Sequence, residues 1–385
     1  MTQESFGSGV PDALDELDLS LIHALQVAPR VPWTELGPVL GADPVTLARR
    51  WRRLVASGSA WTTCYPGPGR GSFDPGCLAL VEVDAERGRV GAVARRLAAD
   101  PHAVAVEHLT GGRDLLVTVG APDPATLTRY LQHRLSAVPG VTASRTHLVT
   151  RLYQEGSSWR LRSLDPGQRR SLVPAGDDAP RPRRVTDAER ELVLALGLDA
   201  RIPVADLARL LGVSAATAAR RLAWLVSSGH ARLRCEVAHS LSGWPVCATL
   251  WVSVPPGELE AVGGALAAHG DVRLCAAVTG TANLCVVTWL RSVGDVPGWE
   301  ADLVRRFPGV AVLDRAVTLE VAKRMGRLLT RDGRAAGYVP LDIWSDPVDA
   351  PGAHTPTSHA PGSHTPASHA FESPALGLGD EGLDE

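Results

Sequence analysis

The chain of 385 residues is 45% hydrophobic and 21% charged, an ordinary composition for a globular protein with two to four compact domains. Its first residues contain no basic stretch followed by an apolar core, so no signal peptide is expected. No apolar run approaches the roughly 18 residues of a membrane span. These features predict a cytoplasmic protein with no membrane partner.

The net charge of −3 conceals two regions of opposite character. From Asp342 onward there are eight acidic residues and no lysine or arginine, and the rest of the chain carries a charge of +5. Lys323 is the only lysine, so almost all positive charge is on arginine. Arginine is suited to bidentate recognition of phosphate and guanine, which is compatible with a nucleic-acid partner.

The cysteines are scattered and form no C-x-x-C pair. This pattern predicts buried thiols in a reducing compartment rather than a disulfide framework or a zinc site, and neither a metal nor a cofactor is expected. The six positions are Cys64, Cys77, Cys235, Cys247, Cys275 and Cys285.

An internal repeat organises the sequence. When residues 14–64 are laid over 185–235 at a constant offset of 171, 18 of the 51 positions are identical. The match continues at an offset that drifts to 169, where Thr110-Gly111 falls on Thr279-Gly280. The repeat is about 140 residues long, so the chain is expected to be a duplicated two-domain unit rather than a solenoid.

Each copy begins with three expected helices, at 15–27, 33–40 and 44–56 in the first copy and at 187–198, 204–211 and 215–226 in the second. Apolar residues recur at helical spacing, and a glycine (Gly41 or Gly212) follows each second helix. Helix, short helix, glycine turn and helix is typical of a helix-turn-helix motif, whose last helix enters the DNA major groove.

The candidate DNA contacts lie on the third helix of each copy, because its early residues face base edges and its arginines reach phosphate or guanine. The outward positions of the second copy are alanines, so the first copy is expected to carry most sequence readout. The candidates are Pro44, Val45, Thr46, Ala48, Arg49, Arg50, Arg52 and Arg53, then Ala215, Ala216, Thr217, Arg220 and Arg221.

An α/β region follows each helical unit. Strands are expected at 77–83, 103–109, 114–119 and 141–153, with helices at 87–99 and 124–137, and the second copy repeats this order between 247 and 323. The order βαββαβ predicts a ferredoxin-like domain. One face of such a sheet is covered by helices, and the other face is expected to pack on a second sheet of the same kind.

The domain plan is therefore α+β: two three-helix, winged helix-turn-helix DNA-binding domains alternating with two ferredoxin-like sensor and dimerisation domains. The expected boundaries are a disordered 1–13, helix-turn-helix domains at 14–66 and 185–240, sensor domains at 75–153 and 245–330, a Pro- and Arg-rich flexible linker at 154–184, and a disordered, acidic, His- and Pro-rich tail at 341–385.

Four stretches of this sequence resemble the Lrp/AsnC (leucine-responsive regulator, feast/famine) family of transcriptional regulators, in a tandem-duplicated form. They are the opening at 14–18, the Pro-x-x-x-Leu-x-x-x-Leu-Gly run at 32–41, the recognition helix at 46–54, and the Thr-Gly turns at 110–114 and 279–283. Together with their echoes they cover about 290 residues. The resemblance implies a sequence-specific, nucleoid-associated regulator that binds double-stranded DNA as a dimer or a larger even-numbered assembly, and that is not an enzyme.

The resemblance also implies a small effector, often an amino acid, near the Thr-Gly turn at a domain interface. Carried over by position, the candidate contacts are Gly111, Gly112 and Asp114, then Gly280, Thr281 and Asn283. Exposed backbone N–H groups of such a turn could hold a carboxylate, and Asp114 could hold an ammonium. A plain tight turn is the competing interpretation, and Asn283 in place of the aspartate makes effector binding less expected in the second copy.

The fusion itself has a consequence for DNA recognition. A symmetric dimer reads a palindrome, whereas a covalent pseudo-dimer with two different recognition helices is expected to prefer an asymmetric operator. Two alternatives stay open. One is a nonspecific architectural DNA-binding protein, and the other is an enzyme resembling sirohaem decarboxylases, for which His102, His108 and Arg113 would be the candidate groups.

Overall fold

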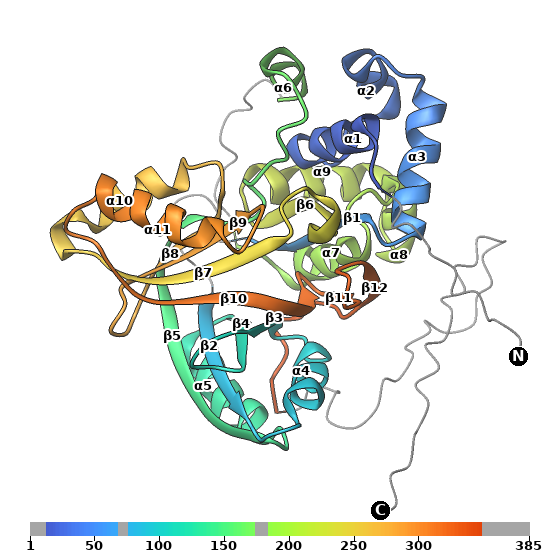
Figure 1. Cartoon of the computed structure of the whole chain (residues 1–385). Coiled ribbons are helices and arrows are strands. Elements are labelled where there is room, and N and C mark those ends of the chain that lie inside the picture. The colour runs from blue at the N-terminus through green and yellow to red at the C-terminus, as the bar shows by residue number, and fades with distance from the viewer. Residues whose placement is uncertain (1–12, 68–75, 174–183, 349–385) are drawn as a thin grey trace, which may run out of the picture. The chain divides into compact units, whose positions relative to one another are not determined.

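The computed structural model describes residues 13–67, 76–173 and 184–348 (Figure 1). The expectations for the N-terminus and for most of the tail fall on residues 1–12 and 349–385 and lie outside the described residues. No helix within the described ranges has the length and apolar character needed to cross a bilayer.

The first helical unit consists of α1 (Glu16–Val27), α2 (Trp33–Leu40) and α3 (Pro44–Ala56). Asp15 and Asp18 form a capping box at the start of α1, and Asp43 caps α3 by accepting hydrogen bonds from the backbone of Val45 and Thr46. Gly41 ends α2 with φ of +62°, a conformation that glycine adopts without strain.

The second helical unit repeats this plan with α7 (Asp187–Leu198), α8 (Val204–Leu210) and α9 (Ala215–Ser227). Thr186 and Glu189 form the capping box of α7, and Ser214 caps α9. The glycine between α8 and α9, Gly212, has φ of +63°, matching its counterpart Gly41. The periodic apolar residues of both units are buried as the sequence predicts.

A two-stranded ribbon joins the helical units. β1 (Ala60–Pro66) follows α3, β6 (Ala231–Val237) follows α9, and the two strands pair antiparallel with Thr63 opposite Arg234. These two residues are 171 positions apart, so the ribbon is centred on the axis that relates the copies.

Two equivalent arginines reinforce this contact. Arg30 donates to the carbonyls of Ala200 and Ile202, the latter at 2.8 Å, and Arg201 donates to the carbonyls of Pro29 and Val31 at 2.7 and 3.0 Å. Each guanidinium therefore satisfies backbone acceptors in the loop from which the other arginine extends.

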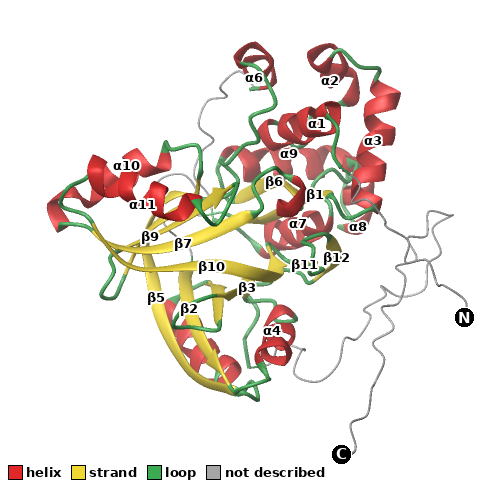
Figure 2. Ribbon diagram, in the orientation of Figure 1, coloured by secondary structure: helices red, strands yellow, loops and turns green. Residues whose placement is uncertain are grey.

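The α/β regions form the rest of the described chain (Figure 2). The first contains β2 (Cys77–Ala85), β3 (Ala103–Leu109), β4 (Leu115–Ala121) and β5 (Val141–Gln154), with α4 (Val90–Ala98) and α5 (Pro124–Arg129), which continues as a π-helical turn, Tyr130–Leu135. The second contains β7 (Val246–Ser253), β8 (Val272–Val278), β9 (Leu284–Leu290) and β10 (Ala311–Arg324), with α10 (Leu259–Ala267) and α11 (Asp295–Arg306).

The strands of the two regions join edge to edge in one sheet, in the order β3-β4-β2-β5-β8-β9-β7-β10, and β10 pairs again with β3. The long strands close this ring because each serves two partners: β5 pairs with β2 and then β8, and β10 pairs with β7 and then β3. Pairing of the sensor regions was expected, but as two separate sheets packed face to face rather than as one barrel-like sheet.

Residues 155–173, which belong to the segment expected to be a flexible linker (154–184), pack against the first helical unit, and residues 174–183 lie outside the described residues. The packed segment contains α6 (Pro166–Leu172), and Trp159, Leu161 and Leu164 are buried there. Backbone N–H groups of Leu161 and Leu164 donate to Gln26 and His23. The physical reason for the difference is that its few large apolar side chains bury surface despite the Pro- and Arg-rich composition.

The start of the expected tail also differs from the prediction, because Leu341 and Ile343 are buried. The short strands β11 (Arg327–Leu329) and β12 (Ala335–Tyr338) extend β10 and precede this segment.

Replacing Arg30 or Arg201 with methionine is expected to lower the free energy of unfolding by about 1–3 kcal/mol, because two backbone carbonyls lose their donor in each case. Urea unfolding of each variant measures this change. Arg305→Met is the matched control, since Arg305 is exposed and its ion pair in the described chain is with Asp302 on its own helix. Equal stability of all three variants would mean that the two arginines do not hold the helical units together.

Candidate nucleic-acid interface and ligand cavity

The candidate DNA contacts at the start of α3 lie at its surface. Val45 is 72% exposed, and Arg49 and Arg52 are exposed. Within the described residues Arg49 forms no ion pair, so its guanidinium is free for a partner in solution. The buried face of α3 carries Leu47, Trp51 and Leu54 instead.

Arg50 and Arg53 lie differently, because both pair with the start of α1. Arg50 contacts the carboxylates of Asp15 and Asp18, the second at 3.0 Å, and Arg53 also contacts Asp18. Asp18 is almost fully buried. These ion pairs fix α3 on α1, so the structure gives Arg50 a positioning role that the sequence interpretation did not separate from DNA contact.

In the second unit, too, one arginine of the third helix pairs with the first helix and the arginine before it is exposed. Arg221, the counterpart of Arg50, lies 3.7 Å from the buried carboxylate of Glu189, the counterpart of Asp18. Arg220, the counterpart of Arg49, is exposed, as are Ala215 and Ala216. Thr217 is half-buried, and its backbone N–H is held by Ser214.

The Thr-Gly turns bind the two halves together. The N–H of Thr110 donates to the carbonyl of Val317, and the N–H of Val317 donates to the Thr110 hydroxyl, both at 2.9 Å. Thr279 makes the same pair of contacts with Leu148. The turns therefore lie at the seam between halves, as expected for an interface.

The candidate effector residues do not converge on a cavity there. Gly111, Gly112, Gly280 and Thr281 are exposed. Asp114 accepts from the backbone N–H of Ala85 at 2.8 Å, and Asn283 both accepts from and donates to the backbone of Val254. These side chains anchor each turn to the end of the neighbouring strand, and their predicted effector contacts stay predictions.

An asymmetric cluster of charges occupies the same seam. Glu82 pairs with Arg113 at 2.8 Å and with Arg145 at 3.0 Å, and Arg113 also pairs with Asp314 of the other half. Arg113 lies 5.6 Å from the centre of the Trp251 ring. The buried arginine is thus neutralised from both halves of the chain.

His147 belongs to this cluster. Its Nε2 lies 3.7 Å from Glu82, and its Nδ1 lies 3.0 Å from the carbonyl oxygen of Thr279. The nearby Glu82 carboxylate raises the pKa of His147 above its usual 6.5, although partial burial opposes the shift. A Cβ at Gly280 would approach His147 to 2.8 Å, so glycine is required for this close approach.

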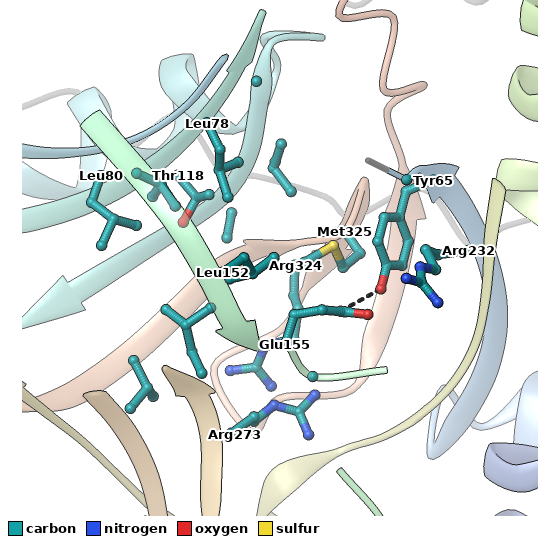
Figure 3. Close-up of a pocket in the computed structure, with 18 of the residues that line it drawn as sticks. Tyr65, Leu78, Leu80, Thr118, Leu152, Glu155, Arg232, Arg273, Arg324 and Met325 are labelled. Atoms are coloured by element: carbon teal, nitrogen blue, oxygen red, sulfur yellow. Dashed lines mark hydrogen bonds between the residues drawn. The ribbon is translucent and has the colours of Figure 1, made fainter. Parts of the chain in front are cut away.

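A cavity of about 350 Å³ lies between the two α/β regions and the β1–β6 ribbon (Figure 3). Figure 3 shows one end lined by Leu78, Leu80 and Thr118, while Arg232, Arg273 and Glu155 lie toward the other. The apolar lining comes from both halves of the chain.

The polar end of the cavity contains three buried arginines, Arg234, Arg273 and Arg324, each about 5% exposed. Arg273 binds both oxygens of Glu236, at 2.8 and 2.7 Å, and Arg234 pairs with the same carboxylate. Burial lowers the pKa of Arg273 to about 9; Glu236 opposes this shift and the two neighbouring arginines add to it.

Arg324 has a weaker partner than the other two. Its nearest carboxylate is that of Glu107, at 3.5 Å, and its Nη1 is buried without a hydrogen-bond partner. Glu155, which also lines the cavity, is already engaged by the Tyr65 hydroxyl at 2.5 Å and by Ser157. The cavity therefore contains a guanidinium that its surroundings leave incompletely bonded.

Sequence reasoning missed this cavity. One signal was present, since Arg273 interrupts an otherwise apolar strand and Arg234 alternates with Arg232 ahead of Glu236. Charged residues in a buried strand are rare unless they are paired or have a role.

The groups considered for an enzyme are not among the residues that line the cavity. His102 is fully buried and lies 3.1 Å from the carbonyl oxygen of Ser345, and Arg113 lies in the seam cluster. Within the described residues no group of three or more His, Cys, Asp or Glu side chains is arranged to hold a metal ion.

Comparison with known proteins identifies the family. Residues 14–55 and 187–225 each match the AsnC-type helix-turn-helix domain, and residues 78–159 match the Lrp/AsnC ligand binding domain. These are the two domain types of the Lrp/AsnC family of transcriptional regulators. Its two family-type helix-turn-helix domains confirm the duplicated form inferred from the repeat.

Curated Lrp/AsnC relatives correspond to less than half of this chain. The HTH-type transcriptional regulator FL11 of Pyrococcus horikoshii is 28% identical over 144 residues, which cover 37% of this chain and 93% of the relative. The HTH-type transcriptional regulator AldR of Mycolicibacterium smegmatis is 27% identical over 142 residues, covering 35% and 81%. These relatives are about as long as one repeat.

A solved structure matches more of the chain. The siroheme decarboxylase NirDL, in a co-complex with an iron-uroporphyrin III analogue, superposes with a TM-score of 0.51 over 81% of this chain and 93% of its own, at 16% identity. At this identity the likeness establishes a shared fold alone. It supports the duplicated helix-turn-helix and ferredoxin-like architecture of this Lrp/AsnC protein.

The seam of this Lrp/AsnC protein is expected to weaken as pH rises. Because the folded pKa of His147 lies above the unfolded value of 6.5, its stabilisation is fully present below pH 6.5 and is lost as pH rises through the folded pKa. Glu82→Gln is expected to move the pKa back toward 6.5 and to flatten this part of the stability profile. NMR titration of His147 and urea unfolding across pH 5–9 measure both effects, and an unchanged His147 pKa in the variant would contradict the assignment.

Proposed function

We propose that this Lrp/AsnC protein is a regulator that reads an asymmetric DNA site with two unlike recognition helices, α3 and α9, carried by one chain. The observation that carries the proposal is the pair of equivalent exposed arginines, Arg49 and Arg220, on helices fixed by equivalent ion pairs. A small effector that changes the spacing of the two helices is part of the same proposal.

The two helices contribute unequally in this proposal. The outer face of α3 offers the exposed Arg49 and Arg52 and the half-buried Thr46, side chains that can donate to base edges and phosphates. The corresponding face of α9 offers Arg220 between alanines, which suits phosphate contact and apolar contact with a thymine methyl group. Sequence readout is therefore assigned mainly to α3 and affinity to both helices.

Selection of binding sites from a random DNA library by the full chain tests this proposal. Arg49→Ala is expected to weaken binding of the selected site about tenfold and to relax its sequence preference. Arg220→Ala is expected to lower the affinity for DNA by a similar factor whatever its sequence. It is also expected to reduce the slope of log affinity against log salt by about 1.

Arg50→Met is the control. Because Arg50 fixes α3 on α1, this variant is expected to lower the thermal stability more than the DNA affinity of the folded protein. Enrichment of a non-palindromic site supports the proposal, whereas a palindrome would contradict the asymmetric pseudo-dimer. Absence of any enriched site at moderate salt, together with a steep salt slope, would favour the architectural alternative.

We also propose that the chain is not an enzyme, although NirDL shares its fold. The absence of His102, His108 and Arg113 from the residues lining the cavity supports this interpretation. Titration with an iron uroporphyrin is expected to give no new absorption band. A saturable band, followed by loss of carboxyl groups from the porphyrin, would favour the decarboxylase alternative.

A further inference from the structure

We propose that the cavity between the two α/β regions is a binding site for a small carboxylate with an apolar body, and that Arg324 binds the carboxylate. This site is separate from the Thr-Gly turns. The proposal deepens the regulator assignment and rests on it for the coupling to DNA; binding of the carboxylate itself is independent of that assignment.

The first argument is the bonding of Arg324. A buried guanidinium is costly unless its N–H groups are paired, and buried arginines are normally satisfied by carboxylates in fork geometry. Arg273 shows that geometry with Glu236, whereas Arg324 has an unpartnered Nη1 and one contact of 3.5 Å to Glu107. A bound carboxylate would supply the missing bidentate partner.

The second argument is the local charge. Glu236 is shared by Arg234 and Arg273, and Glu155 is held by Tyr65 and Ser157, so neither carboxylate is available to Arg324. Four arginines, Arg232, Arg234, Arg273 and Arg324, line the cavity, whereas the carboxylates at the same place are those of Glu107, Glu155 and Glu236, so the charges sum to +1. An anion entering there is favoured electrostatically.

The shape of the cavity selects the rest of the ligand. Beyond the arginines the walls include Leu78, Leu80 and Leu152, which are labelled in Figure 3. Trp289, whose ring centre lies 3.9 Å from the Arg273 guanidinium, also lines the cavity. A volume of about 350 Å³ is at the lower end of the range for small-molecule sites. These features favour an aliphatic or aromatic monocarboxylate over a free amino acid, whose ammonium would lie among guanidinium groups.

The backbone next to Arg324 adds a further observation. Met325 has φ of +47°, the one positive φ among the non-glycine residues that the structure describes, and it lines the cavity. A strained residue of this kind persists where its surroundings hold it in place, and such residues gather at ligand sites. Its carbonyl lies 3.4 Å from the hydroxyl of Thr63 in the β1–β6 ribbon.

Calorimetric titration of the full chain with octanoate and with octanamide, its neutral analogue of nearly the same size, tests the proposal. Octanoate is expected to bind at least about tenfold more tightly, since only the carboxylate forms a charge-assisted pair with Arg324. The apolar contribution is common to both probes and cancels in the ratio.

Two variants at the site and one distant control separate a specific site from general destabilisation. Arg324→Met is expected to weaken octanoate binding about tenfold or more and to leave octanamide binding unchanged. Glu107→Gln is expected to tighten octanoate binding, because it removes the anion that competes for Arg324. Opposite effects at contacting residues do not arise from loss of folding, and Glu107→Gln keeps the test decisive if Arg324→Met folds poorly. Arg305→Met, which removes a distant exposed arginine, is expected to bind as the wild type does.

Three results would overturn the proposal. They are equal affinities for octanoate and octanamide, wild-type octanoate affinity in Arg324→Met, and absence of binding by octanoate, 3-phenylpropanoate and indole-3-acetate up to about 10 mM.

The coupling to DNA is measured separately, as the change in Kd for the selected DNA site on adding saturating octanoate. The change is expected in the wild type and not in Arg324→Met. A chain that binds octanoate but no specific DNA would refute the regulator proposal and leave the carboxylate site intact.

Discussion

The hydrogen bonds between β10 and β3 and between β5 and β8 are the interaction on which the rest of the structure depends. Without them, the four-stranded sheet of each half would present β3 and β5, or β8 and β10, as unpaired edges. Unpaired edges recruit other strands, and closing a sheet on itself abolishes them. The Thr-Gly turns and the two arginines Arg30 and Arg201 also form equivalent pairs of contacts between the halves, and these contacts add to the strand pairing. The duplication thus supplies each half with its partner at high effective concentration.

The two halves carry different charged residues at equivalent positions of the seam between them. At equivalent positions, Arg113 of the first half corresponds to Ala282 of the second, and Arg145 corresponds to Asp314. Arg113 pairs with Asp314, so two first halves joined in the same way would set Arg113 against a second Arg145. Two arginines in contact there would repel each other, and this repulsion discriminates against that assembly. The asymmetry of the seam therefore matches the asymmetry of the recognition helices, because both require one first half and one second half.

The parts of the fold that depend on local pattern were predictable. The spacing of apolar residues, the caps and the turn glycines located the helices, and the offset of 171 residues located the second copy. The closure of the sheet was not predictable, because edge pairing between β10 and β3 joins segments more than 200 residues apart. The large apolar residues Trp159, Leu161 and Leu164 could have indicated that residues 155–173 pack against the rest of the chain. The Pro- and Arg-rich composition of the segment led to the prediction of a flexible linker instead. At the recognition helix, the sequence identified Arg49 and Arg50 together, and only the position of Asp18 separates their roles.

The cavity is lined by residues from both halves of the sheet and from the β1–β6 ribbon. Leu80 and Leu152 come from the first half, Arg273 from the second, and Tyr65 from the ribbon that follows α3. Since β1 and β6 lead directly from the recognition helices, a molecule that fills the cavity touches the strands to which both helices are attached. Such a molecule can shift the spacing of α3 and α9 only if it binds one arrangement of the ribbon better than another. Tyr65, held by Glu155 at the wall of the cavity, and Arg234, opposite Thr63 at the centre of the ribbon, are the residues through which that preference would act.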